Sequence, residues 1–167
     1  MRTLRFTQYG PPSILLFEEV AVPTLTDDEV LVEVRAASVN PSDVATVAGA
    51  FKSPLPRTPG RDFAGVVVSG NRWRGKEVWC SGAGFGASRE GAHAQLVAVP
   101  EAWLSEKPAG LSMEEASAVG IPFLAAWEAL VRMAHLVEGE TILITGAGGS
   151  VGRAATQIGL CCINRAL

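Results

Sequence analysis

Apolar and more polar positions alternate over several short segments in the first hundred residues of the chain. Residues 30–35 place valine at every second position, which predicts a half-buried strand. Further strands are predicted at residues 1–6, 63–68, 77–80 and 94–99. Segments rich in Pro and Gly separate these strands. Short strands at this spacing favour a closed or partly closed barrel, because closure removes exposed sheet edges.

The periodicity changes after Pro108, where helical spacing replaces alternation. Ser112 stands three residues before Glu115, which is the spacing of a capping box at the start of a helix. Residues 123–135 have helical periodicity. The longest apolar stretch, residues 116–131, is interrupted by polar and proline positions and is too short to span a bilayer. We therefore expect a buried helix or helical hairpin here.

A continuous apolar run at residues 142–144 leads directly into a glycine-rich turn. The run predicts a strand covered on both faces, as in a parallel sheet. Gly146, Gly149 and Gly152 follow at a spacing of three, and residues without Cβ let the backbone approach a pyrophosphate closely. From Ser150 onward apolar positions recur at helical spacing, so a phosphate would meet a helix N-terminus. The pattern favours a dinucleotide site over a plain glycine-rich turn, and a P-loop is excluded because no Lys-Ser or Lys-Thr follows the glycines.

The composition is that of a globular protein, with 167 residues, of which 48% are hydrophobic and 19% charged, and a net charge of -3. This length suggests one domain, or one domain and a piece of another. The mild acidic balance and the lack of basic runs argue against a nucleic-acid partner. The first residues carry no apolar core of signal-peptide length, so we expect neither secretion nor a membrane partner.

Cysteine and histidine positions argue against a disulfide framework and against a metal site. The cysteines, Cys80, Cys161 and Cys162, are too few for a framework and are typical of a reducing cytoplasm. They do not show C-x-x-C spacing, and both His93 and His135 lie far from any cysteine cluster. For each histidine, a surface position or a locally satisfied side chain is favoured over a ligand or acid–base role.

Six segments, taken in order, carry a resemblance to a known superfamily. They are residues 40–43 (NPSD), 59–67 (PGRDFAGVV), 75–79 (GKEVW), 91–95 (GAHAQ), 125–130 (AAWEAL) and the glycine turn. Together they resemble the medium-chain dehydrogenase/reductase superfamily, and more narrowly its zinc-independent quinone oxidoreductase (zeta-crystallin-like) branch.

The resemblance implies a mainly β fold in two parts. A partly closed chaperonin-10 (GroES)-like barrel would form the catalytic domain over residues 1–122. A connecting helix and the first βα unit of a nucleotide-binding Rossmann α/β domain would follow over residues 123–167. The active site would lie in the cleft between the two domains, where such sites usually occur.

The resemblance also implies that no zinc is bound. In the zinc-dependent relatives cysteine, histidine and cysteine occupy the positions of Asn40, Arg61 and approximately Ile121. The four closely spaced cysteines of the relatives' structural zinc lobe are also missing here. Reduction without a Lewis acid needs an already activated acceptor, such as a quinone or an α,β-unsaturated carbonyl (enone).

The catalytic residues that the resemblance implies are Asn40 and Ser42. The Asn40 amide would donate to a developing oxyanion near the nicotinamide, and Ser42 matches the hydroxyl position of a proton relay in the zinc-dependent relatives. Alternatively, Asn40 is a turn residue before a proline, and Ser42 and Asp43 cap a helix. Arg61 and Asp62 either form a structural ion pair or face the cleft.

The implied cofactor is NADP(H), with NAD(H) as the alternative. The residue that distinguishes the two lies about twenty residues beyond the glycine turn, after Leu167. The residues implied to bind the cofactor are Asn40, Ala125, Gly146, Gly148, Gly149, Ser150, Val151 and Gly152. The expected reaction is hydride transfer to a quinone or enone. The alternatives are a 2-enoyl thioester reductase of the same superfamily and a non-enzymatic remnant or binding module.

We expect this chain to be a truncated form, because Leu167 closely follows the first Rossmann unit. A parallel-sheet strand needs cover on two faces, yet only one helix follows residues 142–144. Leaving such side chains exposed forfeits roughly 1.5–3 kcal/mol each, and open strand edges invite pairing. We therefore expect either disorder from about residue 138 or burial against a second chain, as a homodimer or other self-association through this unit.

Overall fold

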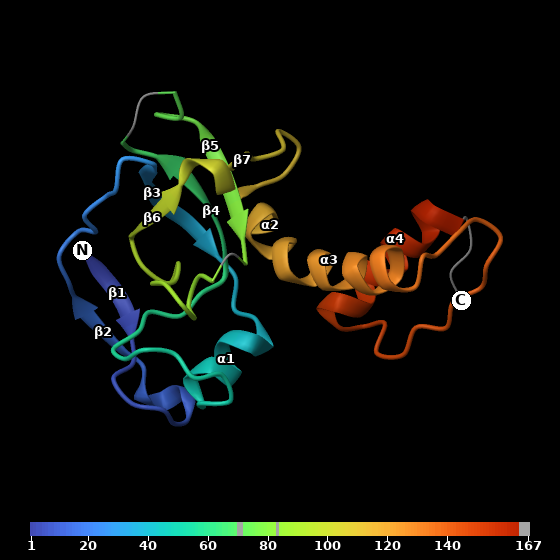
Figure 1. Cartoon of the computed structure of the whole chain (residues 1–167), viewed down its shortest axis with the longest axis horizontal. Coiled ribbons are helices and arrows are strands. Elements are labelled where there is room, and N and C mark those ends of the chain that lie inside the picture. Colours follow the sequence, from blue (N-terminus) through green and yellow to red (C-terminus); the bar gives the residue numbers. More distant parts are fainter. Residues whose placement is uncertain (70–71, 83, 164–167) are drawn as a thin grey trace. The chain divides into compact units, whose positions relative to one another are not determined.

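The structure, a computed structural model, describes residues 1–69, 72–82 and 84–163. The chain forms two compact units, Met1–Ala118 and Val119–Leu167 (Figure 1). Each unit has its own hydrophobic cluster. The expected boundary after residue 122 falls inside helix α3 (Gly120–Trp127). The assignment of residues 1–122 and 123–167 to separate domains stays a prediction.

The first unit is built on two antiparallel sheets. A two-stranded sheet pairs β1 (Arg2–Arg5) with β2 (Leu16–Glu19). A five-stranded sheet has the order β6-β3-β4-β5-β7. Its strands are β3 (Glu29–Ala37), β4 (Asp62–Val67), β5 (Glu77–Ser81), β6 (Leu96–Pro100) and β7 (Ser105–Glu106). The strands predicted in the first hundred residues are confirmed. The sequence did not predict β2 and β7, because neither strand has a buried side chain and so neither shows alternation of apolar and polar positions.

The hydrophobic core of the first unit, which is the larger of the two clusters, lies on one face of the five-stranded sheet. Val30 and Val32 of β3 are fully buried there because alternate residues of a strand point to the same face. Phe63 of β4 is also fully buried and meets Phe85 edge to face, with ring centroids 5.3 Å apart. The spacing of valines that predicted β3 therefore also identified its core face.

The barrel of the first unit is open. Among the described residues, the edge strands β6 and β7 each pair on one side only, so the sheet does not close on itself. Backbone bridges from Thr3 to Ala94 and from Phe6 to Arg57 join the first segment of the chain to the loops before β6 and β4. The mainly β architecture is confirmed. Of the two expected forms, a closed and a partly closed barrel, the closed barrel is not formed.

Short helices complete the first unit. These are η1 (Pro12–Ile14), α1 (Pro41–Val47), η2 (Glu101–Trp103) and α2 (Met113–Ala118). The predicted capping box is confirmed at α2, where Ser112 N donates to Glu115 Oε2 at 2.8 Å and Glu115 N donates to Ser112 Oγ at 3.1 Å. The capping interaction fixes the start of this helix.

The second unit is helical. It contains α3, the π-helical turn η3 (Glu128–Met133) and α4 (Ser150–Ile163). Ala126 of α3 and Ala154, Ala155 and Ile158 of α4 are buried against one another. The predicted helices at residues 123–135 and from Ser150 onward are thereby confirmed.

The predicted strand at residues 142–144 is wrong for this structure. The segment has no assigned strand, and no β-bridge joins it to any residue that the structure describes. Ile144 packs against the cluster of the second unit, while Leu143 remains 85% exposed. A strand is defined by its hydrogen bonds to a neighbouring strand, and the described part of this unit offers none. The expected disorder or association of this region stays a prediction.

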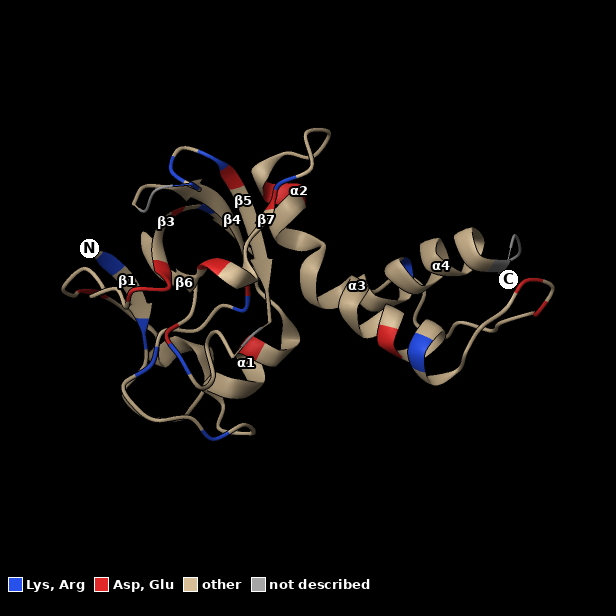
Figure 2. Ribbon diagram, turned by 45° about the horizontal axis from the view of Figure 1, so that its top comes forward, with Lys and Arg blue, Asp and Glu red and all other residues tan. Residues whose placement is uncertain are grey.

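Charged side chains of both signs are interspersed over the first unit (Figure 2). Several of them pair with each other, as Lys107 Nζ does with Glu77 Oε2 at 3.1 Å. None of the helices in the described parts of the chain combines the length and the apolar character that crossing a membrane requires.

Candidate functional site

Asn40 stands at the junction of β3 and α1 and is 5% exposed. Its backbone is extended (φ -99°, ψ 154°), as expected for a residue before a proline. Its Nδ2 donates to Asp62 Oδ2 at 2.8 Å and to Ser38 Oγ at 3.1 Å. Both amide hydrogens are therefore engaged within the protein, and Asn40 can donate to a ligand only by giving up one of these bonds.

Asp62, at the start of β4, is the centre of this polar network and is 0% exposed. Besides Asn40, its carboxylate accepts from Ser38 Oγ at 3.2 Å and from Ser81 Oγ at 2.6 Å. Asp62 and Ser81 are register partners on β4 and β5, which explains how residues distant in sequence meet. Sequence reasoning missed this contact, because it depends on the pairing of β4 with β5, which no local pattern specifies. The network fixes the orientation of the Asn40 amide.

At the start of α1, Asp43 has the expected capping role, whereas the Ser42 hydroxyl does not cap the helix. Asn40 N donates to Asp43 Oδ2 at 2.8 Å, so Asp43 caps the helix. Ser42 Oγ is buried and has no hydrogen-bond partner in the part of the chain that the structure describes. A buried hydroxyl without a partner is uncommon, and a ligand is one way to satisfy it. Arg61 Nε lies 4.0 Å from Asp43 Oδ1.

His93 contacts the same network through the backbone of Ser38. Its Nε2 lies 2.9 Å from the backbone oxygen of Ser38, which confirms the locally satisfied side chain expected for this histidine. A mostly apolar cavity of about 120 Å³ lies beside α1, and Val39, Val44 and His93 are among its walls. The cavity places apolar surface beside the helix that carries Ser42.

The glycine turn of the second unit has the backbone geometry that the sequence predicted. Gly146 has φ +68°, a conformation that favours glycine, and Gly149 N donates to Gly146 O at 2.9 Å. A Cβ at Gly152 would collide with Gly146 O and with Ala147 Cα. A Cβ at Gly148 would meet nothing within 4 Å. The turn is therefore tight on its inner side and open on its outer side.

Helix α4 begins directly after the glycine turn. Ser150 begins the helix, whose first N–H groups have no intrahelical partner and attract an anion. Val151 is 43% exposed at this end. The residues present therefore fit a pyrophosphate group, which would be held by Gly146, Gly148, Gly149, Ser150, Val151 and Gly152.

The structure brings the expected site residues together in two groups. Asn40 and Ser42 lie in the first unit, where both stand at the start of α1. Ala125, exposed on α3, and the glycine turn lie in the second unit. The role of each residue in catalysis or cofactor binding stays a prediction.

Two further observations concern metal ions and thiols. Among residues 1–69, 72–82 and 84–163, no three His, Cys, Asp or Glu side chains are grouped as a metal site would require. Burial raises the pKa of the Cys80 thiol to about 11. Cys80 is thus a neutral core side chain at physiological pH, unlike the exposed Cys161.

These observations match one protein family. Residues 26–109, half of the chain, match the family model of the alcohol dehydrogenase GroES-like domain. The chain belongs to this family and, as the sequence predicted, to the medium-chain dehydrogenase/reductase superfamily that contains it. The expected GroES-like fold is thereby confirmed.

Among curated proteins, quinone oxidoreductase of Pongo abelii is 36% identical over 166 residues, covering 95% of this chain and 49% of that protein. The 2-methylene-furan-3-one reductase of Solanum lycopersicum is 37% identical over 170 residues, covering 95% of this chain and 44% of that protein. The chain spans about half the length of the curated relatives it matches.

Solved structures give the same result. An alcohol dehydrogenase superfamily protein from Novosphingobium aromaticivorans has a TM-score of 0.87 at 35% identity, covering 99% of this chain and 51% of that one. The quinone oxidoreductase from Thermus thermophilus, whose structures include a complex with NADPH, has a TM-score of 0.82 at 30% identity. The match covers 97% of this chain and 50% of that one.

Proposed function

We propose that the protein is an NAD(P)H-dependent oxidoreductase of the quinone reductase type, which reduces a quinone or an enone without zinc. The glycine turn at the start of α4 carries this proposal, because it offers free N–H groups and an open approach to a pyrophosphate. The named activities of the relatives from Pongo abelii and Solanum lycopersicum support the two acceptor classes.

The substrate side of the proposal rests on Asn40 and Ser42. A bound nicotinamide would supply the hydride, and the acceptor's oxygen would then need a hydrogen-bond donor. Ser42 Oγ can donate without breaking a bond, whereas the Asn40 amide is held by Asp62 and Ser38. We therefore assign the donor role first to Ser42, with Asn40 as the rigid neighbour that shapes the site.

Residue types at three positions support a reaction without zinc. Asn40, Arg61 and approximately Ile121 stand where the superfamily resemblance places cysteine, histidine and cysteine in the zinc-dependent relatives. Amide, guanidinium and alkyl groups are poor zinc ligands. The chain's own contribution to catalysis is then positioning and hydrogen bonding.

We also propose a cofactor, a cellular location and a mode of assembly for the protein. We take NADP(H) as the cofactor, supported by the NADPH complex of the Thermus thermophilus relative. The three free cysteines are consistent with the cytoplasm. Self-association through the second unit is supported by its exposed apolar side chains, among them Met133 and Leu143.

Titration with NADPH tests the cofactor site. Gly148→Ala should weaken NADPH binding by about tenfold or more, because its methyl group occupies the open side of the turn without disturbing the fold. Gly110→Ala is the matched control, since a Cβ there also meets nothing within 4 Å. Equal NADPH affinity for the two variants, or no binding by the unaltered chain at millimolar NADPH, contradicts the proposal.

Turnover tests the substrate side. Ser42→Ala should lower kcat for quinone reduction by about tenfold or more at unchanged NADPH affinity, because the acceptor loses its donor. Ser13→Ala, at an exposed serine of η1, is the control. An unchanged kcat in Ser42→Ala removes this residue from the mechanism. A chain that binds NADPH but reduces neither quinones nor enones is a binding module.

A further inference from the structure

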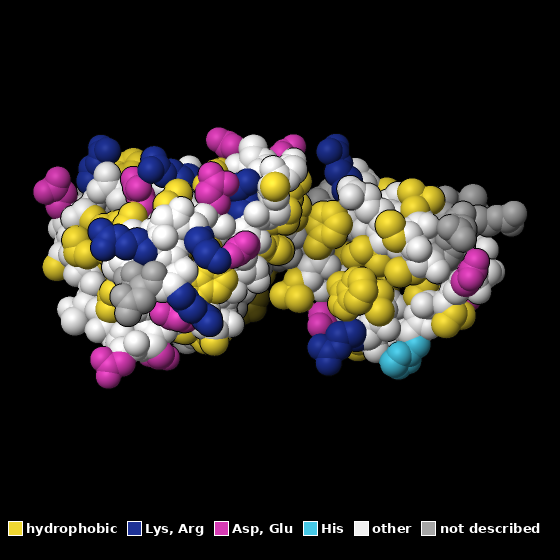
Figure 3. Space-filling model, turned by 90° about the horizontal axis from the view of Figure 1, so that it is seen from above, with side chains coloured by type: hydrophobic (Ala, Val, Ile, Leu, Met, Phe, Trp, Pro, Cys, Tyr) yellow, Lys and Arg dark blue, Asp and Glu magenta, His cyan; other side chains and the backbone are white. Residues whose placement is uncertain are grey.

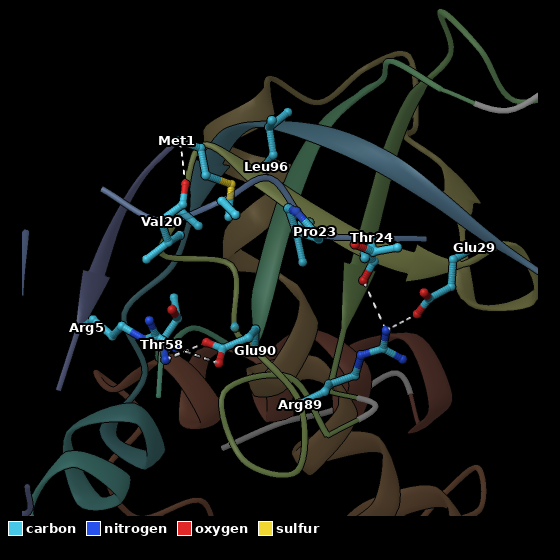
Figure 4. Close-up of a pocket in the computed structure, with 15 residues that line it drawn as sticks. Met1, Arg5, Val20, Pro23, Thr24, Glu29, Thr58, Arg89, Glu90 and Leu96 are labelled. Carbon is cyan, nitrogen blue, oxygen red and sulfur yellow. Dashed lines mark hydrogen bonds and ion pairs between the residues drawn. The ribbon is translucent and has the colours of Figure 1, made fainter. Parts of the chain in front are cut away.

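A second cavity lies in the first unit, on residues that the proposed reaction does not use. Its volume is about 410 Å³, within the range of small-molecule sites. Its walls come from the segment between β2 and β3, from residues 89–91 and from the region around β6 (Figure 4). Neither Asn40 nor Ser42 nor Asp62 lines it. The cavity is therefore a separate candidate site.

At one end of this cavity, the charged side chains already have partners within the protein. Arg89 Nη2 bonds to Glu29 Oε1 and donates to Ala98 O at 3.2 Å. The Arg89 guanidinium also lies over the rings of Phe85 and Trp103, at 5.3 Å and 5.1 Å from their centroids. Burial alone would raise the pKa of Glu29, but hydrogen bonds from Arg89 and Thr26 outweigh burial and lower it. This end has little to offer a ligand.

The other end holds a guanidinium with weak contacts. Arg5 Nη2 lies 3.5 Å from Glu90 Oε1, and Arg5 Nη1 lies 3.9 Å from Glu18 Oε2. Charge-assisted hydrogen bonds are normally about 2.7–2.9 Å long. The Arg5 side chain keeps 22% of its surface exposed, and Figure 4 shows it beside Thr58 and Glu90. Its Nη groups are therefore donors available to a ligand.

The charge around Arg5 decides what kind of ligand suits these donors. Arg57 Nη1 also lies 3.9 Å from Glu90 Oε1, and Thr58 N donates to Glu90 Oε2 at 2.8 Å. Arg5 and Arg57 thus face Glu18 and Glu90, so the formal charges of these four side chains balance. The Met1 ammonium on the cavity wall donates to Val20 O at 2.7 Å. A ligand carboxylate would bring an extra negative charge into this end. A neutral carbonyl oxygen needs only a donor, which Arg5 supplies.

The remaining wall is apolar. Among the residues that line the cavity, Val20, Ala21, Pro23, Ala94, Leu96 and Val97 are apolar. An apolar body of a few carbon atoms can be buried there, with a favourable contribution of about 25 cal/mol per Å² removed from water. We propose that this cavity binds a small neutral carbonyl compound, with its oxygen on Arg5 and its apolar body against this wall.

A matched set of small probes tests the ligand class. Benzamide has the carbonyl and the apolar body, benzoate adds a charge, toluene lacks the acceptor and acetamide lacks the apolar body. Titrations followed by backbone amide NMR shifts should show benzamide binding best, with shifts in residues 20–22, 24 and 89–98. The proposal is overturned if benzoate or toluene binds as tightly as benzamide, or if benzamide does not bind at about 20 mM.

Three variants locate the binding. Arg5→Met should weaken benzamide binding by about tenfold, the effect of losing a hydrogen bond to a charged donor. Arg35→Met, at an exposed arginine paired with Glu33, should leave benzamide binding unchanged. Ala21→Trp, on an exposed loop, should occlude the cavity and abolish binding even if Arg5→Met folds poorly. Unchanged binding in Ala21→Trp overturns the proposal. None of these measurements requires NADPH or turnover, so they stand apart from the proposed function.

Discussion

The two units of this protein differ in how completely their apolar residues are covered. Among the described residues, the largest fully buried side chains, which include Phe6, Phe63 and Phe85, all lie in the first unit. The cluster of the second unit is made mainly of small side chains from α3 and α4. Figure 3 shows hydrophobic side chains spread over the face of the second unit at its right. The first unit thus buries several large side chains in its core, whereas the second unit buries mainly small ones.

Removing a core ring from the first unit should have the largest effect on this contrast. Phe63→Ala should lower the free energy of unfolding by about 3–5 kcal/mol, because it deletes a fully buried side chain and leaves a cavity. Urea denaturation followed by near-UV circular dichroism measures the change. Phe17→Ala, at an exposed ring on β2, is the control and should change stability little. Equal effects would mean that the sheet face does not form the core.

The polar network at the candidate site should contribute the next largest effect. Asp62→Ala should cost about 1.5–3 kcal/mol, because a hydrogen-bonded carboxylate is lost and the Asn40 amide loses an acceptor. Asp27→Ala removes an exposed carboxylate and should be nearly neutral in the same denaturation experiment. If the Asp27 and Asp62 variants unfold at the same urea concentration, the network does not hold the site together.

High pH should weaken the first unit through Cys80. The thiol has its pKa raised by burial to about 11, above the ordinary value of 9.0. Its stabilising contribution is therefore complete below about pH 9 and is lost as pH rises toward 11, by roughly 1.4 kcal/mol per pH unit within that window. Cys80→Ala should lack this slope in stability, while Cys161→Ala should keep it. A thiol reagent should modify Cys161 in the native protein and leave Cys80 unmodified until unfolding.

The sequence predicted elements better than it predicted contacts. Valines at every second position identified β3 and its buried face, and glycine spacing identified the tight turn before α4. The bonds from Asp62 to Asn40 and Ser81 depend on the pairing of β3, β4 and β5, which local patterns do not specify. The wrong strand at residues 142–144 has the same origin, because a strand needs a neighbour as well as an apolar sequence.

The smallest change in stability, and the sharpest test of the contrast, should come from Leu143. This side chain is 85% exposed, so Leu143→Lys should alter the free energy of unfolding by no more than about 0.5 kcal/mol. If the second unit associates through the extended segment around Leu143, a lysine there should oppose pairing, since an inward-facing charge blocks edge-to-edge contact. Sedimentation velocity over a concentration series should then show a shift from dimer toward monomer. Val22→Lys, at an exposed apolar residue of the first unit, should leave the dimer intact. A monomeric unaltered chain contradicts self-association, and an undisturbed dimer in Leu143→Lys places it on another surface.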